Sequence, residues 1–199
     1  MPVNVDNRGR ENSINIDPRV LADGKGTISI GGHRNIVNIA SGCTLLNLKI
    51  TLGSDCRIDL GQDSRLAAID IVALGKGRVS IGQNCQFTWG SRFLLHEAGA
   101  ISVGAECLIA SGTLFTVSDM HSILDLDTGE RINPARDIVV EDHVWIGLQA
   151  NVLKGVRIGT GSVVAMGSIV TQDIPAHSLA AGVPARVVRS RIGWDARLL

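Results

Sequence analysis

Aliphatic residues recur at every sixth position along much of this chain. The register is unbroken in the second half, where it falls on Val140, Ile146, Val152, Ile158, Val164 and Val170. Comparable but less regular units begin at Ile39, Leu52, Leu60, Ile81 and Val103. Neither the roughly 3.6-residue turn of an α-helix nor the two-residue alternation of a β-strand gives this period. The repeat therefore predicts a β-solenoid whose short strands turn a corner once per repeat.

Two other positions of the repeat indicate corners and a narrow interior. The fourth position is Gly, Asn or Asp in eight of the eleven units, and these residues tolerate the positive φ angles of a tight corner. The fifth position is always small or β-branched, and all four cysteines occupy it: Cys43, Cys56, Cys85 and Cys107. Their spacing is unlike that of zinc or CxxC redox sites. We therefore expect buried structural thiols, which suit a reducing compartment.

Length and composition limit the classes of protein to consider. The 199 residues suffice for one domain with its own core, and 45% of them are hydrophobic. The net charge of zero gives no indication of nucleic-acid binding, and no apolar run reaches the roughly 18 residues of a membrane span. The first residues, MPVNVDNRGREN, lack the basic start and apolar stretch of a signal peptide. We expect a cytoplasmic protein.

The second half of the repeat carries a family pattern. Residues 144–189 read VWIGLQANVLKGVRIGTGSVVAMGSIVTQDIPAHSLAAGVPARVVR. This stretch resembles the hexapeptide-repeat acetyltransferases, and most closely those that O-acetylate sugars and polysaccharides. The resemblance implies an all-β, left-handed parallel β-helix of about seven coils. The β-helix would span residues 21–187, with one protruding loop at about 118–137. An N-terminal cap or arm at 1–20 would precede it, and a short C-terminal tail at 188–199 would follow.

The segment SDMHSILDLDTGERIN, residues 118–133, interrupts the repeat and contains a histidine. A loop of the family at this place carries the catalytic histidine, so the resemblance implies that role for His121, which lies 24 residues before Trp145. Histidine suits a general base because imidazole titrates near neutral pH. Asp119, Asp125 or a backbone carbonyl would orient the second ring nitrogen, and the sequence leaves these three open.

The resemblance also implies residues that bind acetyl-CoA, the acetyl donor. These positions are Trp145, Leu148, Met166, Thr171, Gln172, Arg186 and Arg189. Met166 replaces an alanine that is common in relatives and Gln172 replaces a lysine, so we expect altered cofactor contacts there. An arginine suits phosphate oxygens because its guanidinium forms two parallel hydrogen bonds. Trp145 points outward in the repeat, either as a pocket wall or as part of a subunit contact.

His96 and Glu97 are the candidate acceptor-binding residues. They stand where sugar-acetylating relatives often have acidic residues that face the acceptor. The family forms homotrimers with active sites between subunits, so the resemblance implies a homotrimer, a saccharide acceptor and no metal. The favoured activity is acetyl transfer from acetyl-CoA to a saccharide hydroxyl.

Three alternative functions stay open at this point. An N-acetyltransferase of an amino sugar or small amine would use the same residues, because an amine also loses a proton. A zinc enzyme like the γ-class carbonic anhydrases would need three histidines from neighbouring strands, and the five histidines here are scattered. A non-catalytic scaffold is the third alternative, although it would have no need of His121 or Trp145.

Overall fold

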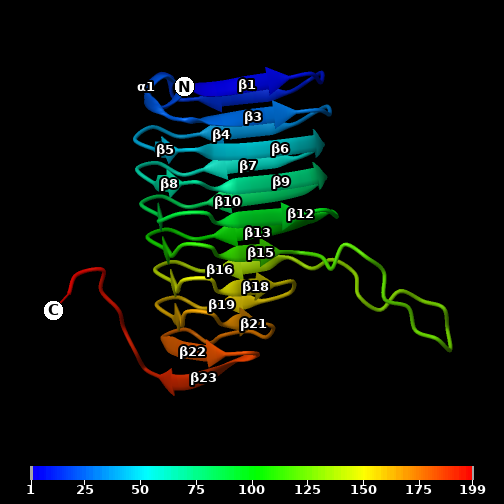
Figure 1. Cartoon of the computed structure of the whole chain (residues 1–199), viewed down its shortest axis with the longest axis vertical. Coiled ribbons are helices and arrows are strands. Elements are labelled where there is room, and N and C mark those ends of the chain that lie inside the picture. Colours follow the sequence, from blue (N-terminus) through cyan, green and yellow to red (C-terminus); the bar gives the residue numbers. More distant parts are fainter. Residues whose placement is uncertain (1, 199) are drawn as a thin grey trace.

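The computed structural model describes residues 2–198, which form a column of parallel strands with three sides (Figure 1). Sheet A consists of β1 (Val3–Asn7), β3 (Gly26–Ile30), β6 (Leu48–Ser54), β9 (Asp70–Gly75), β12 (Arg92–Leu95), β15 (Leu114–Thr116), β18 (Asn151–Leu153) and β21 (Ile169–Val170). Sheet B consists of β2 (Ser13–Ile16), β4 (Ile36–Ile39), β7 (Arg57–Leu60), β10 (Gly77–Ile81), β13 (Gly99–Val103), β16 (Ile138–Val140) and β19 (Arg157–Ile158). Sheet C consists of β5 (Thr44–Leu46), β8 (Arg65–Ala67), β11 (Gln86–Phe87), β14 (Leu108–Ile109), β17 (Trp145–Ile146), β20 (Val163–Val164), β22 (Ser178–Gly182) and β23 (Ala185–Ser190).

Successive coils stack in register, so equivalent residues form continuous interior columns. In sheet A one such column contains Ile28, Ile50, Ile71, Phe93 and Phe115, and all five are completely buried. The rings of the two phenylalanines stack with their centroids 4.7 Å apart. Each aliphatic side chain buried in this way contributes roughly 1.5–3 kcal/mol. The aliphatic repeat therefore forms the core, as the period predicts.

The corners have the backbone conformation that the fourth repeat position predicts. Seven of the eight Gly, Asn and Asp residues there have positive φ: Gly42, Asp55, Asp63, Asn84, Gly155, Gly161 and Gly167. Glu106 and His143, which occupy the same position in other units, also have φ angles of 57° and 53°. The four cysteines lie inside these corners and are buried and unbridged, so the prediction of structural thiols is confirmed.

The N-terminal residues belong to the column. β1 pairs with β3 and β2 pairs with β4, so the segment expected to be a cap or arm forms most of a first coil. The helix α1 (Pro18–Asp23) then takes the place of a sheet C strand, and the Asp17 carboxylate caps it by accepting hydrogen bonds from two backbone amides. The eight strands of sheet A thus exceed the about seven coils that were expected.

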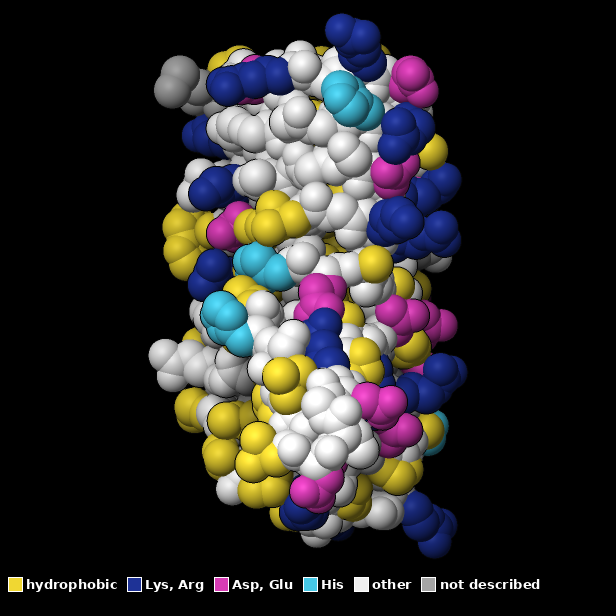
Figure 2. All heavy atoms as spheres, turned by 90° about the vertical axis from the view of Figure 1, so that its right-hand side faces the viewer, with side chains coloured by type: hydrophobic (Ala, Val, Ile, Leu, Met, Phe, Trp, Pro, Cys, Tyr) yellow, Lys and Arg dark blue, Asp and Glu magenta, His cyan; other side chains and the backbone are white. Residues whose placement is uncertain are grey.

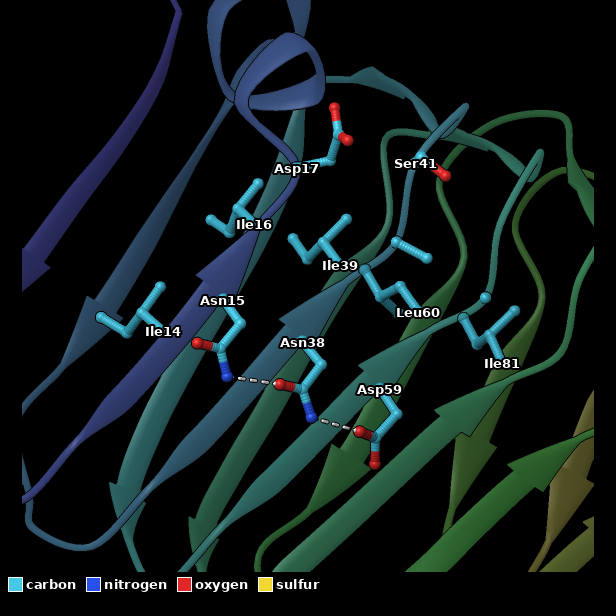
Figure 3. Close-up of a pocket in the computed structure, with 12 residues that line it drawn as sticks. Ile14, Asn15, Ile16, Asp17, Asn38, Ile39, Ser41, Asp59, Leu60 and Ile81 are labelled. Atoms are coloured by element: carbon cyan, nitrogen blue, oxygen red, sulfur yellow. Dashed lines mark hydrogen bonds between the residues drawn. The ribbon is translucent and has the colours of Figure 1, made fainter.

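A polar ladder crosses the outward face of sheet B near this end (Figure 3). Asn15 donates to Asn38 at 2.8 Å, and Asn38 donates to Asp59 at 2.7 Å. These side chains line a shallow pocket of about 820 Å³. Because the polar groups of the ladder bond to one another, we read it as a device that joins coils. It lies in the first coils, well before the loop.

The column is interrupted between β15 and β16, at the place of the predicted loop. Residues 117–137 leave the corner between sheets A and B and project far to the right in Figure 1. One isolated antiparallel bridge, between Leu124 and Arg131, joins the two arms of this loop. At the other end of the chain β23 turns back antiparallel to β22 and closes sheet C. No helix of the described residues is long and apolar enough to cross a membrane.

Candidate active site

The loop is tied to the column by a network of polar side chains at its root. Figure 2 shows the molecule from the side on which the loop projects, with acidic and basic side chains next to one another in the middle of that surface. Arg131 in the returning arm binds Glu97 through two hydrogen bonds, of 2.6 and 2.7 Å. Ser118, at the start of the loop, donates a third to the same carboxylate at 2.5 Å. Hydrogen bonds from Arg131 and then from Ser118 lower the pKa of Glu97 to about 2.

Asn133 organises the second half of the network. Its amide nitrogen donates to Asp119 at 2.7 Å and to the backbone carbonyl of His121 at 2.8 Å. Its amide oxygen accepts from the backbone N–H of Ile123 at 2.7 Å and from Nε of Arg131 at 3.1 Å. This amide is almost completely buried, so its four bonds are shielded from water. The backbone around His121 is therefore held in one place.

Lys154 fixes the loop from the following coil. Its ammonium donates to the Asp119 carboxylate at 2.5 Å and to the Asn133 carbonyl at 2.9 Å. The hydrogen bond from Lys154, followed by that from Asn133, lowers the pKa of Asp119. Asp119 is thus ionised and held by Lys154 and Asn133.

His121 itself is exposed, and its ring has no hydrogen-bond partner among residues 2–198. Of the three orienting groups left open by the sequence, Asp119 bonds to Lys154 and Asn133, and Asp125 accepts from the backbone N–H groups of Asp127 and Thr128. Neither carboxylate contacts the imidazole within one chain. The ring is therefore available to a group from outside this chain.

His96 and Glu97 follow β12, one coil above the start of the loop, because Leu94 pairs with Thr116. Glu97 is part of the network described above. His96 is half-buried, and its Nδ1 atom is buried without a hydrogen-bond partner in the described chain. A buried polar atom without a partner is costly unless a ligand or water satisfies it. The structure therefore places His96 beside the loop root with an unused ring nitrogen.

The residues expected to bind acetyl-CoA lie elsewhere, mainly on sheet C and its corner with sheet A. Trp145 points outward from β17 and is 38% exposed. Leu148 and Met166 stack on successive coils, since the carbonyl of Leu148 accepts from the N–H of Gly167 at 2.8 Å, and both side chains are exposed. Leu148 and Met166 therefore form one exposed apolar area at the corner, and Trp145 is an exposed apolar side chain on the adjacent sheet C.

The remaining cofactor candidates lie at the C-terminal end of the column. Thr171 and Gln172 are exposed directly after β21, at the corner between sheets A and B. Arg186 and Arg189 are exposed on β23, at the end of sheet C. Thr171 and Gln172 share this corner with the loop and lie one coil beyond Lys154, because Val152 pairs with Val170. None of the four residues has a hydrogen bond to the loop network within residues 2–198.

His121 and Trp145 do not lie together within one chain. The loop leaves the corner between sheets A and B, whereas Trp145 faces outward from sheet C, the opposite side of the prism. In Figure 1 the loop extends to the right, and the sheet C strands β5 and β8 lie at the left edge. Within residues 2–198 no cluster of three His, Cys, Asp or Glu side chains could hold a metal ion.

Sequence reasoning missed several residues that shape this region. Ser118, Asn133 and Lys154 hold the loop, and Trp194 packs beside Trp145 with its ring centroid 6.1 Å away. The first two lie within the segment 118–133, where a serine and an asparagine were only a weak signal for anchoring. Nothing in the repeat points to Trp194.

Comparison with known proteins defines the family. The hexapeptide repeat of succinyl-transferase matches residues 137–172. A polysialic acid O-acetyltransferase of Escherichia coli O1:K1 is 32% identical over 125 residues, which are 63% of this chain and 40% of the relative. The polysialic acid O-acetyltransferase of Neisseria meningitidis is 30% identical over 150 residues, which are 74% of this chain and 68% of the relative.

Solved structures agree with this assignment. The polySia specific acetyltransferase NeuO superposes with a TM-score of 0.86 and 29% identity, over 98% of this chain and 90% of that one. The polysialic acid O-acetyltransferase OatWY superposes with a TM-score of 0.71 and 26% identity, over 100% of this chain and 93% of that one.

The chain belongs to the hexapeptide-repeat acetyltransferases, a family of acyltransferase enzymes, and its fold is the left-handed parallel β-helix of that family. The predictions of fold and family are confirmed. Two relatives that are similar over most of this chain are polysialic acid O-acetyltransferases. The matched part spans less than half of the Escherichia coli relative and about two thirds of the Neisseria one.

Proposed function

We propose that this protein transfers an acetyl group from acetyl-CoA to a hydroxyl of a saccharide, with His121 as the general base. The observation that carries the proposal is the state of His121: Asn133 holds its backbone, while its ring is exposed and unpaired within residues 2–198. The relatives that act on polysialic acid support a saccharide acceptor. The acetyl-CoA donor fits the cytoplasmic location expected from the sequence.

In the proposed reaction a ring nitrogen of His121 takes the proton of the acceptor hydroxyl as its oxygen attacks the thioester carbonyl. The tetrahedral oxyanion then collapses, the carbon–sulfur bond breaks, and coenzyme A leaves as a thiol after the imidazolium returns the proton. Donors for the oxyanion would be backbone N–H groups at a coil corner. The residues proposed to bind the donor are Trp145, Leu148, Met166, Thr171, Gln172, Arg186 and Arg189.

We further propose that the active site forms between subunits of a homotrimer. His121 and Trp145 lie on opposite sides of one chain, so a loop that covers sheet C of a neighbour would bring them together. The exposed apolar side chains of Trp145, Leu148 and Met166 would be covered in such an assembly. Light scattering on the purified protein measures the subunit number, and a monomer would contradict this part of the proposal.

The test is release of coenzyme A thiol from acetyl-CoA in the presence of saccharides and amines. We expect release with a saccharide class and a loss of at least ~10²-fold in rate in His121→Asn. His177→Asn is the matched control, because His177 is also exposed but lies at the corner between sheets B and C. Full activity of His121→Asn would refute the base assignment.

N-acetylation is the second candidate, and one observation favours it. The 2,3,4,5-tetrahydropyridine-2,6-dicarboxylate N-acetyltransferase of Staphylococcus aureus is 51% identical over 55 residues, which are 28% of this chain and 23% of that protein. An amine acceptor would need the same proton transfer to His121. Thiol release with amines, but with no saccharide, would select this candidate over O-acetylation.

A further inference from the structure

The C-terminal tail, residues 191–198, folds back along the column and is fixed by Trp194. The indole N–H of Trp194 donates to the carbonyl of His143 at 2.8 Å, and Nε2 of His143 lies 3.3 Å from the carbonyl of Trp194. The two rings stack with centroids 4.3 Å apart and planes 9° apart. Ile192 adds a backbone bond to the carbonyl of His177 at 2.9 Å. The tail is therefore an ordered part of the surface.

A cleft of about 380 Å³, which we name the tail cleft, lies between this tail and the column. Two parallel rows of side chains from successive coils run beneath it. The corner row consists of Asn84, Glu106 and His143. The strand row consists of Gln86 and Leu108, and strand pairing continues it to Trp145, which lies just outside the lining of the cleft. Trp194 stacks over the last level, so it forms the end wall of the cleft.

The chemistry of the tail cleft matches a hydroxyl-rich ligand. The side chains of Asn84, Gln86 and Glu106 are exposed and make no hydrogen bond to any residue in the 2–198 range. Amides offer both donors and acceptors, and a carboxylate offers acceptors, so together they complement sugar hydroxyls. Leu108 and the indole of Trp194 offer apolar surface for the C–H face of a sugar ring. The volume is within the range of small-ligand sites.

The position of the tail cleft links it to the proposed active site. Trp194 lies 6.1 Å from Trp145 between ring centroids, with the planes tilted by 48°. The end wall of the cleft thus lies next to the tryptophan that is proposed to meet acetyl-CoA. Since coils are about 4.8 Å apart, its two open levels extend along the column axis away from Trp145. Asp195 at the rim is already paired with Arg197 at 2.7 Å.

We propose that the tail cleft is a subsite for a second sugar residue of the acceptor, next to the residue that is acetylated. This inference rests on the proposed function and adds to it, because an acceptor that fills the subsite must be an oligosaccharide or a polysaccharide. Trp194 provides the stacking surface, and Asn84, Gln86 and Glu106 provide the hydrogen bonds.

Binding is tested without turnover, by saturation-transfer NMR with sialic acid and with short and long oligosialic acids as probes. We expect saturation of ring protons in the oligomers with the wild-type protein and with Trp89→Ala. Trp89 is the matched control because it is a 56% exposed tryptophan outside the cleft. Trp194→Ala should weaken oligomer binding about fivefold or more, and Gln86→Ala should weaken it as well. Trp194→Phe should keep most of the binding, which separates stacking from loss of the tail.

Steady-state rates then separate failure of the subsite from failure of the proposed function. Trp194→Ala should raise KM for oligosialic acid and leave KM for sialic acid and acetyl-CoA within about twofold. The subsite would be overturned if thiol release showed the same KM for the oligomer in wild type and in Trp194→Ala. It would also be overturned if the wild type bound no oligomer. Trp194-dependent binding without any thiol release would support the subsite and refute the proposed transferase.

Discussion

The guanidinium of Arg131 and the carboxylate of Glu97 face each other through two parallel hydrogen bonds, of 2.6 and 2.7 Å. Arg131 lies in the returning arm of the loop and Glu97 is the second residue after the strand β12, so this pair joins the loop to the column. The same carboxylate also accepts from Ser118. Because its oxygens already accept three bonds, Glu97 serves first as an anchor, which leaves the adjacent His96 as the better candidate for contact with the acceptor.

Replacing Glu97 by Gln should loosen the loop and lower kcat. An amide cannot accept both bonds from Arg131 as a carboxylate does, so the position of His121 becomes less defined. We expect a loss of about tenfold or more, since small displacements of a catalytic group are costly. The readout is thiol release beside Glu11→Gln, a control that removes an exposed carboxylate outside the described ion pairs. The double variant Glu97→Arg/Arg131→Glu exchanges the two charges and should restore part of the rate. Equal rates in all variants would contradict the proposal that this ion pair anchors the loop.

The same ion pair predicts how stability depends on pH. The pKa of Glu97 is lowered from its ordinary value of 4.5 to about 2 by hydrogen bonds from Arg131 and Ser118. A carboxylate with a lowered pKa in the folded state adds stability that is complete above its unfolded pKa and is lost as pH falls toward the folded one. Wild type should therefore exceed Glu97→Gln in Tm near pH 7, and the two curves should converge between about pH 4.5 and pH 2. Parallel Tm curves over this range would refute the assignment.

Asn133→Ala should lower both stability and kcat. Its amide makes four hydrogen bonds in a nearly buried place, and removing them leaves the partners unsatisfied, at a cost of about 1–3 kcal/mol. Because Asn133 positions the backbone of His121 and does not touch the ring, kcat should fall while KM for acetyl-CoA and the apparent pKa of the pH–rate profile stay unchanged. Asn151→Ala is the control, since that amide makes one long bond of 3.4 Å. A shift of the pH–rate profile would instead place Asn133 in contact with the imidazole.

The repeat made most of the fold predictable, because the strands and corners of each coil in a solenoid are determined by residues close together in the sequence. Each inward column and each corner recurs at fixed positions, so Val140, Ile146 and Val152 indicate buried strands before any long-range contact is known. The loop was visible as the place where this period stops. The first coil was harder to recognise. Val5, Ile14 and Ile16 are only partly buried at the open end of the column, where a coil has a neighbour on one side only.

The loop anchors and the tail could not be derived in the same way. Asn133 reaches Asp119 across 14 positions, and Lys154 reaches it across 35, along a path that has no period. Trp194 meets His143 across 51 positions after the chain has reversed direction at β23. Such contacts depend on how an irregular segment folds back, which the hydrophobic pattern does not encode.

Gly147, the glycine of the WIG motif, should be intolerant of a methyl group. A Cβ atom there would lie 2.6 Å from the backbone nitrogen of Met166 and 2.8 Å from the carbonyl oxygen of Val164, both in the next coil. Backbone atoms cannot move aside as a side chain can, so Gly147→Ala should separate the coils beneath Trp145. At Gly31 the nearest atom to such a Cβ lies 3.8 Å away, and neither glycine has a positive φ. We therefore expect Gly147→Ala to cost about 1–3 kcal/mol and Gly31→Ala to be neutral or slightly stabilising. Urea denaturation measures both, and equal midpoints for the two variants would show that the corner at Gly147 has more room than its geometry indicates.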